Sequence, residues 1–282
     1  MTFLQILILG LVQGTAELLP VSSSAHVIVV EKLMGLDPSS PEMTFLLVML
    51  HTGTMFAVIT YFWRTWRTLY LSSQSIFLAT MKNVAIATLA TGLIGLGLKA
   101  IIERFFLDGG DIELLFAKLP VIVASLLVAG GLILASSRPT RRNATDTEIS
   151  SRIAGIVGLA QGLCLPFRGL SRSGTTISTG LMLRVGRRQI EAFSFALAVV
   201  LTPPVLCRTV LRLLKAHPEV KEPSHMVALL KPGLAGAACS FVAGLLALWL
   251  LSRMLESGRW KGFGYYCLGF AAFVAGLAWA GY

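Results

Sequence analysis

The chain contains long apolar blocks, each near the roughly 20 residues that an α-helix needs to cross the hydrocarbon core of a bilayer. Six such blocks lie at about 43–63, 83–102, 114–136, 189–211, 227–252 and 262–281. The composition agrees, because 55% of the 282 residues are hydrophobic and only 13% are charged, whereas a soluble domain carries about 25% charged residues. The sequence therefore predicts an all-α, polytopic membrane protein with about six transmembrane helices.

The formal net charge of +10 does not indicate a nucleic-acid partner. The basic residues lie in short runs between the apolar blocks, whereas nucleic-acid-binding proteins gather them on one face or stripe. Their distribution instead predicts orientation, because cytoplasmic loops are enriched in Lys and Arg. The loops at 64–82, 138–152 and 253–261 are basic, which predicts that they are cytoplasmic and that both termini face outward. The basic segment 212–231 is an exception, since the same count places it outside.

Two further apolar regions, at about 1–36 and 152–186, are interrupted midway by Pro, Gly, Ser and charged residues. Irregular backbone at membrane depth is tolerated only where it is buried in protein or lines a wet cavity. We therefore expect each region to form a re-entrant helical hairpin.

An internal repeat relates these two regions. Residues 10–14, Gly-Leu-Val-Gln-Gly, recur as residues 158–162, Gly-Leu-Ala-Gln-Gly, and each copy is followed by a proline and a serine cluster. The repeat predicts a single membrane domain over 1–282, with one inverted repeat at 1–140 and the other at 150–282. Proteins built in this way bind their ligands where the two broken hairpins meet in the membrane.

The polar residues of the hairpins form the candidate site. The first hairpin contributes Glu17, Ser22, Ser23, Ser24 and His26. The second contributes Ser171, Arg172, Ser173 and Thr176, close to the start of an apolar helix. A charge at bilayer depth costs about 2.5–3.5 kcal/mol on insertion scales, so the glutamate needs a partner or a cavity. A helix N-terminus with an arginine suits phosphate, because its free N–H groups and the guanidinium bind anionic oxygens.

Each of these features also has a purely structural explanation. Small polar residues such as Ser22, Ser23 and Ser24 often join membrane helices. Glu17 and Arg172 could form only a buried ion pair, and His26 could be a core histidine with satisfied hydrogen bonds. Their combination on two broken hairpins favours a site for phosphate chemistry.

The two segments resemble the motifs of the bacterial undecaprenyl-diphosphate phosphatase family, also called bacitracin-resistance proteins. The family's first motif, E-G-x-T-E-F-L-P-V-S-S-T-G-H, is similar to residues 13–26, and its second, P-G-x-S-R-S-G-x-T-I, to residues 168–177. Residues 50–54 and 193–195 are also similar to family segments. Gln13 stands where the family usually has its first glutamate, and Arg168 stands where it has the first proline of the second motif.

The resemblance implies hydrolysis of undecaprenyl diphosphate to undecaprenyl phosphate and inorganic phosphate, which recycles the carrier lipid for peptidoglycan and other envelope polymers. It implies a polyprenyl diphosphate lipid and membrane lipids as partners, a homodimer, and a bacterial inner-membrane location with the site open to the outer side. Arg172 is expected to bind the diphosphate oxygens, and other groups to complete the phosphate site: the hydroxyls of Ser22, Ser24, Ser171, Ser173 and Thr176.

We expect Ser23 to be the nucleophile and His26 its activating base, since a hydroxyl is weak until a neighbouring base takes its proton. His26 could instead attack phosphorus itself. Glu17 is expected to orient His26 or to bind a divalent cation, Mg²⁺ or Ca²⁺, which prefer oxygen ligands. Gln13 in place of a second carboxylate predicts weaker metal binding than in typical relatives.

Two other functions remain open on the sequence. Inverted repeats and broken helices are the usual frame of secondary transporters, so the chain could be a transporter or flippase for the polyprenyl phosphate. Gln13 and Arg168 could instead mark a non-catalytic relative that binds polyprenyl diphosphate. A pure carrier needs no nucleophile, which separates it from an enzyme.

Overall fold

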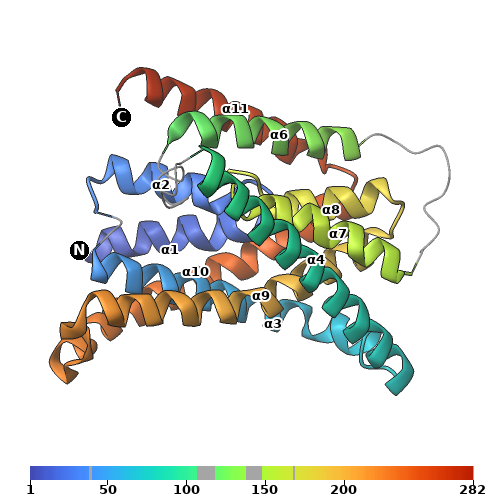
Figure 1. Ribbon diagram of the computed structural model, residues 1–282, viewed down its shortest axis with the longest axis horizontal. Coiled ribbons are helices and arrows are strands. Elements are labelled where there is room, and N and C mark those ends of the chain that lie inside the picture. The colour runs from blue at the N-terminus through green and yellow to red at the C-terminus, as the bar shows by residue number, and fades with distance from the viewer. Residues whose placement is uncertain (38–39, 107–117, 138–147, 168, 282) are drawn as a thin grey trace.

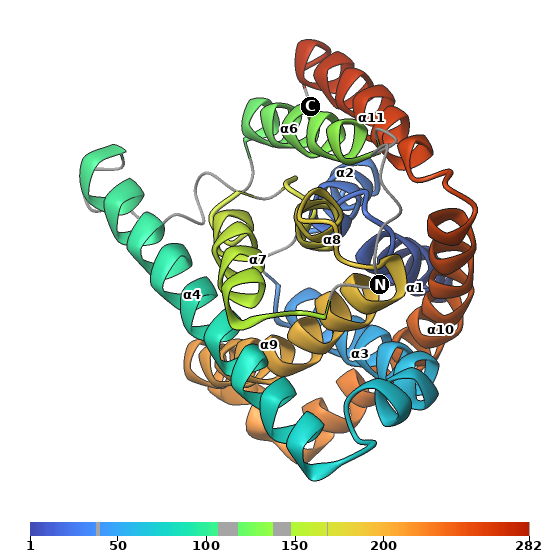
Figure 2. The same ribbon diagram turned by 90° about the vertical axis from the view of Figure 1, so that its right-hand side faces the viewer.

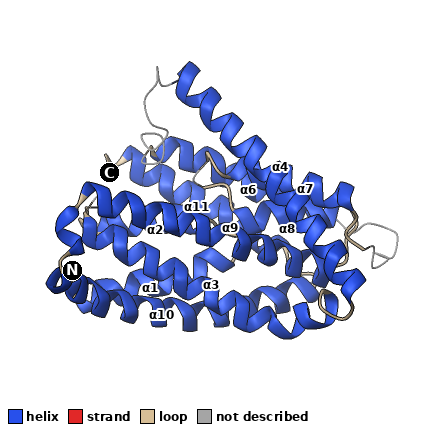
Figure 3. Ribbon diagram, turned by 60° about the horizontal axis from the view of Figure 1, so that its bottom comes forward, coloured by secondary structure: helices blue, strands red, loops and turns tan. Residues whose placement is uncertain are grey.

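A computed structural model describes residues 1–37, 40–106, 118–137, 148–167 and 169–281, and within these ranges the secondary structure is helical, without strands (Figure 3). Figure 1 shows the chain beginning and the last helix ending at the same end of the molecule, as the charge pattern predicts. Some positions of the sequence analysis lie outside the described ranges: Arg168, residues 138–147 of the basic loop 138–152, and residues 114–117 of the predicted apolar block 114–136.

Six helices in the described part of the chain are long and apolar enough to cross a membrane, which confirms the predicted multi-pass membrane protein. They are α3 (Pro41–Leu69), α4 (Gln74–Phe106), α6 (Leu119–Ser136), α9 (Arg187–Ala216), α10 (Pro223–Glu256) and α11 (Lys261–Trp279). A short 3₁₀ helix, Pro218–Lys221, joins α9 to α10. Most of the helices run past the predicted apolar blocks, because their polar terminal turns continue the helix where hydropathy no longer marks a span.

The two interrupted regions form pairs of short helices. They are α1 (Phe3–Leu18) with α2 (Ser23–Leu33), and α7 (Ser151–Cys164) with α8 (Arg172–Met182). Their lengths of 11 to 16 residues correspond to about 16–24 Å, less than the roughly 30 Å core of a bilayer. In Figure 1 the two turns lie near the middle of the molecule and the open ends lie at opposite ends. That each pair enters and leaves the membrane on one face stays a prediction.

The breaks between the short helices have local causes. After α1 the chain is extended at Leu19, Pro20 has no N–H to continue the helix, and Ser22 adopts a positive φ of 70°. After α7, Pro166 plays the same part and Gly169 has a φ of 118°, a conformation that glycine adopts without steric cost.

The repeated glycine segments are sites of close helix packing. Gly14 on α1 faces α10, where an added Cβ would lie 2.6 Å from the Ser240 carbonyl oxygen. Gly158 on α7 faces α4, where a Cβ would lie 2.3 Å from the Ala87 carbonyl oxygen. Both belong to a G-x-x-x-G segment, in which small residues let two helix backbones approach. The first helix of each pair is therefore packed closely against a long helix from the other half of the sequence, and the division into two repeats stays a prediction.

Helix α8 lies inside the bundle. Figure 2 shows it surrounded by other helices, and it packs against α6, α7 and α9. Its buried residues include several hydroxyls, and they are Ser173, Gly174, Thr175, Thr176, Ile177, Ser178 and Gly180. The start of this helix is consequently enclosed by protein, next to the turn of the first pair.

We expect Gly158→Ala to destabilise the protein by about 1–3 kcal/mol, the usual cost of forcing an extra carbon into a packed contact. Gly97→Ala on the outer face of α4 is the matched control, because nothing lies within 4 Å of its added Cβ. This change should leave stability unchanged or raise it slightly, since alanine is the better helix former. Thermal unfolding in detergent, followed by tryptophan fluorescence, measures both. Equal melting temperatures for the two variants would contradict the close α4–α7 contact.

Candidate active site

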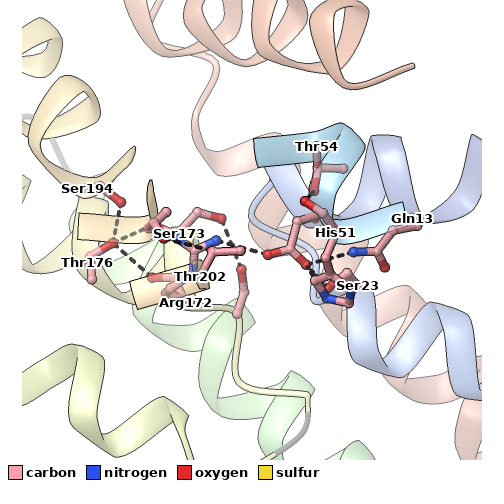
Figure 4. A network of polar contacts seen from close by, with 12 residues as sticks. Gln13, Ser23, His51, Thr54, Arg172, Ser173, Thr176, Ser194 and Thr202 are labelled. Atoms are coloured by element: carbon pink, nitrogen blue, oxygen red, sulfur yellow. Dashed lines mark hydrogen bonds and ion pairs between the residues drawn. The ribbon is translucent and has the colours of Figure 1, made fainter. Parts of the chain in front are cut away.

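The carboxylate of Glu17, in the last turn of α1, connects the two helix pairs. Its Oε1 accepts a hydrogen bond from Nη2 of Arg172 at 3.0 Å. Its Oε2 accepts one from the Ser23 hydroxyl at 2.5 Å and one from the Gln13 amide at 3.2 Å. Figure 4 shows Arg172 on one side of this network and Gln13 and Ser23 on the other. The structure thus brings together Glu17, Ser23 and Arg172 of the predicted site, and their roles in catalysis stay predictions.

A histidine from α3 joins this group. Nε2 of His51 lies 3.9 Å from Oε2 of Glu17, and its Nδ1 donates to the Leu47 carbonyl at 2.8 Å. Because a carbonyl can only accept a hydrogen bond, Nδ1 of His51 carries a proton, and this bond holds the orientation of the imidazole ring. His51 is not among the residues that the sequence predicts for the site. The available signal was an ionisable side chain within an apolar span, which is a functional candidate by default.

A pocket opens beside the carboxylate, between α1, α3, α8 and α9. Its polar lining comprises Glu17, His51, Thr54, Arg172 and Thr202. Its apolar lining comprises Leu18, Met55, Val58, Ala198 and Val199. Charged groups therefore border apolar walls, a lining whose chemistry matches an anionic group attached to an apolar chain.

The N-termini of α2 and α8 present their first residues to the same carboxylate. Ser23 is the first residue of α2 and Arg172 is the first residue of α8. The two N-termini differ in capping: the Ser171 hydroxyl accepts from the Gly174 amide at 3.1 Å, whereas Ser22 makes no side-chain capping hydrogen bond. The first amides of a helix have no partner within the helix. The start of α2 is thus the less capped of the two, and such an N-terminus attracts anions.

Ser22, the residue before α2, has an unusual backbone conformation with φ 70° and ψ 93°. Residues other than glycine rarely adopt positive φ, and such strain costs about 1–3 kcal/mol and tends to occur at functional sites. Because Ser22 is buried and does not cap the helix through its side chain, its backbone is the feature that sets the direction of Ser23.

The predicted pairing of His26 with Ser23 is not the one found. Nδ1 of His26 donates to the Ser22 carbonyl at 2.8 Å, and Nε2 bonds to the Tyr266 hydroxyl at 2.8 Å. The ring also stacks on Phe270, with centroids 3.8 Å apart. Both nitrogens are therefore engaged on the side of α2 that faces α11. The hydroxyl of Ser23 donates to Glu17 instead, so a carboxylate and not an imidazole is the neighbouring base.

The predicted hydroxyls of the second pair make contacts within the protein. The Ser173 hydroxyl donates to the Leu19 carbonyl at 3.4 Å, which links the two pairs. Thr176 bonds to the Ser194 hydroxyl at 2.6 Å and so links α8 to α9. Ser24 lies in the first turn of α2 and is partly buried. Binding of phosphate by these residues and by Ser171 stays a prediction.

The two terminal nitrogens of Arg172 differ in their contacts. Its Nη2 binds Glu17, while Nη1 is buried without a hydrogen-bond partner in the described structure. Buried donors are almost always paired, so this guanidinium nitrogen is an unused donor of a residue that lines the pocket.

Comparison with known proteins connects this chain with one family. The family described as "Bacitracin resistance protein BacA" matches residues 6–273 of the chain. The chain is 52% identical to Undecaprenyl-diphosphatase 2 of Acinetobacter baylyi over 283 residues, which covers 99% of each protein. It is 34% identical to the Undecaprenyl-diphosphatase of Syntrophotalea carbinolica, with 95% of each protein covered. It is 37% identical to that of Thermomicrobium roseum, with 89% of each covered.

Substitutions at Ser22 test whether the positive φ is an intrinsic part of the site. Ser22→Gly should leave the melting temperature nearly unchanged, because glycine adopts this conformation freely. Ser22→Val should lower stability by about 1–3 kcal/mol, since a β-branched residue at positive φ is strained. Ser24→Val, in the first turn of α2, is the control and should have the smaller effect. If Ser22→Val melts no lower than Ser24→Val, the strained conformation at Ser22 is refuted.

Proposed function

The chain belongs to the family of the bacitracin resistance protein BacA, and we propose on this premise that it hydrolyses undecaprenyl diphosphate to undecaprenyl phosphate and inorganic phosphate. The proteins it resembles are named undecaprenyl-diphosphatases, which favours the phosphatase over the transporter and the non-catalytic binding protein. The activity recycles a carrier lipid for cell-envelope synthesis.

The observation that carries the proposal is the meeting of Arg172 and Ser23 at the carboxylate of Glu17, which lines the pocket together with Arg172. Phosphoryl transfer demands little of a protein beyond positioning the phosphates, stabilising their charge and orienting a nucleophile. A guanidinium, a hydroxyl and a carboxylate that accepts from both supply these three parts. The apolar lining next to them suits the start of a polyprenyl chain.

Arg172 is assigned to the terminal phosphate. Its Nη1 has no partner in the described protein, so it can bind a phosphate oxygen while Nη2 keeps its hydrogen bond to Glu17. The amides at the start of α2 add further donors, because the helix N-terminus carries a partial positive charge and unpaired N–H groups. These donors neutralise the charge that builds up on the phosphoryl oxygens in the transition state.

Ser23 is the proposed nucleophile, and Glu17 the group that receives its proton. The hydrogen bond from the Ser23 hydroxyl to Oε2 of Glu17 already points that proton at the carboxylate. Attack by Oγ on the terminal phosphorus forms a phosphoserine and breaks the bond to the bridging oxygen, and the electron pair leaves with the lipid monophosphate. Water then cleaves the phosphoserine, releases inorganic phosphate and restores the hydroxyl.

His26 would take part only after a rearrangement, because both of its nitrogens are engaged with Ser22 and Tyr266. A direct attack by His26 would give a phosphohistidine instead of a phosphoserine. The two are separated by their chemistry, since phosphohistidine is labile in acid and phosphoserine is not. Trapping the phosphorylated enzyme in acid would therefore yield a Ser23 peptide under the present proposal.

The proposed setting is the bacterial inner membrane, with the site opening to the outer side. The basic loops at 64–82, 138–152 and 253–261 support this orientation, since cytoplasmic loops carry an excess of Lys and Arg. The diphosphate lipid is then taken from the outer leaflet. A homodimer is expected from the family resemblance alone.

Arg172→Ala should lower phosphate release by about 10²–10³-fold, the usual cost of removing one well-placed donor to a transition-state oxyanion. The measurement is inorganic phosphate released from undecaprenyl diphosphate by detergent-purified protein. Arg152→Ala is the matched control, because Arg152 is an exposed arginine in the first turn of α7. A folded wild-type protein that binds the lipid without releasing phosphate would refute the enzyme proposal and support the binding protein.

A further inference from the structure

We propose that the carboxylate of Glu17 acts without a resident divalent metal ion, and that Gln13 is the residue that makes the site independent of metal. The inference rests on the proposed function, because it concerns the same site. It departs from the expectation, drawn from family resemblance, that Glu17 binds Mg²⁺ or Ca²⁺.

Hydrogen-bond donors of the protein surround the carboxylate of Glu17. An ionised carboxylate has about four lone-pair positions. Three of them accept hydrogen bonds: Oε2 accepts from Ser23 and Gln13, and Oε1 accepts from Arg172. The His51 ring lies a further 3.9 Å from Oε2. A metal ion at Glu17 would have to bind at the remaining position of Oε1, next to the guanidinium, or displace one of these donors.

The negative charge of Glu17 is already balanced within the protein. Glu17 and Arg172 form an ion pair with 18% and 22% of their side chains exposed, so the pair is already balanced. A divalent ion bound to Glu17 would lie next to the guanidinium, with no second carboxylate to offset it. Like charges in a poorly solvated site repel strongly, and the ion would leave uncompensated positive charge at membrane depth.

The protein offers few oxygen ligands for a divalent metal ion around Glu17. A resident Ca²⁺ takes six to eight oxygen ligands, and Mg²⁺ is held by one or two carboxylates with waters and substrate phosphates completing its shell. Besides Glu17, the polar lining of the pocket consists of two threonine hydroxyls, an imidazole and the guanidinium. Across the described ranges, no group of three or more His, Cys, Asp and Glu is placed to hold a metal ion. The donor set therefore fits protein cations and not a hard metal ion.

The residue at position 13 determines whether the site works without a metal ion, as with Gln13, or binds one. It lies one turn before Glu17 on α1, and its amide nitrogen already contacts Oε2 at 3.2 Å. A carboxylate at position 13 would lie equally close to Glu17, and two carboxylates sharing a site cannot both stay ionised unless a cation joins them. Gln13→Glu should thus create a metal site from groups already in place.

The experiment uses full-length protein in detergent, freed of metal with a chelator, and titrated with Mn²⁺ in the absence of lipid. Electron paramagnetic resonance counts free and bound Mn²⁺. Wild type should show no stoichiometric site, and Gln13→Glu should bind one Mn²⁺. Gln5→Glu is the matched control, because it adds the same charge two turns earlier on α1, away from Glu17, and keeps the capping box at Thr2; it should bind none.

Phosphate release provides an independent readout. Wild type should keep its rate in excess chelator, whereas Gln13→Glu should lose more than about a hundredfold and recover with Mg²⁺, since a catalytic metal supplies a large part of the charge stabilisation. Stoichiometric Mn²⁺ binding by wild type, or a wild-type activity that requires added metal, would overturn the inference. Gln13→Glu protein that folds but binds no Mn²⁺ would overturn the role of Gln13.

Failure of the proposed function gives a different result. A protein that releases no phosphate under any condition refutes the phosphatase proposal, while the Mn²⁺ titration still decides whether Glu17 holds a metal. The two outcomes are read from separate samples, one with lipid and one without.

Discussion

The ionised carboxylate of Glu17 dictates how the two halves of this chain meet. A charge at bilayer depth costs about 2.5–3.5 kcal/mol on insertion scales, and its place in the last turn of α1 is unfavourable as well, because a helix C-terminus carries a partial negative charge. Neither helix pair can satisfy Glu17 alone. Gln13 and Ser23 come from the first pair, whereas the guanidinium of Arg172 comes from the second. The ion pair thereby fixes the relative position of the two turns.

Close backbone packing gives this polar centre a rigid support. Gly14 and Gly158 allow α10 and α4 to contact the first helix of each pair almost backbone to backbone, as small residues do where no hydrophobic effect drives helices together. The short helices are held along their length, so their turns cannot relax easily. That rigidity is what lets Ser22 retain a positive φ of 70°, since strained conformations persist only where the surroundings over-determine them.

Much of the architecture followed from patterns that physical chemistry makes explicit. Apolar blocks gave the six spans because a helix must be apolar over the full bilayer thickness, and the broken segments gave the short pairs because Pro20 and Pro166 cannot continue a helix. The meeting of Glu17 with Arg172 was also foreseeable, since intramembrane charges pair. The hydrogen-bond partner of Ser23 was not foreseeable from the sequence. His26 lies three residues from Ser23 on α2, yet its ring is drawn to Tyr266 and Phe270 on α11, and nothing in the local sequence specifies that contact. His51 lies at the site because α3 packs against α1, and the local sequence does not specify this tertiary contact either.

The way charge is distributed around the pocket bears on turnover as well as on binding. Among the described residues, Arg172 provides the one full positive charge that is hydrogen-bonded to Glu17, and one of its two terminal nitrogens is already bound to that carboxylate. Under the proposed function, further stabilisation of the phosphate would come from oriented dipoles, above all from the start of α2, which has no side-chain cap. Fixed dipoles act most strongly on charge that develops close to them, and they need not reorganise during the reaction. A site of this kind stabilises the transition state more than the bound phosphate product, and only such differential stabilisation accelerates the chemical step. A second full charge at the same position would hold substrate and product alike, and would slow release of the phosphate.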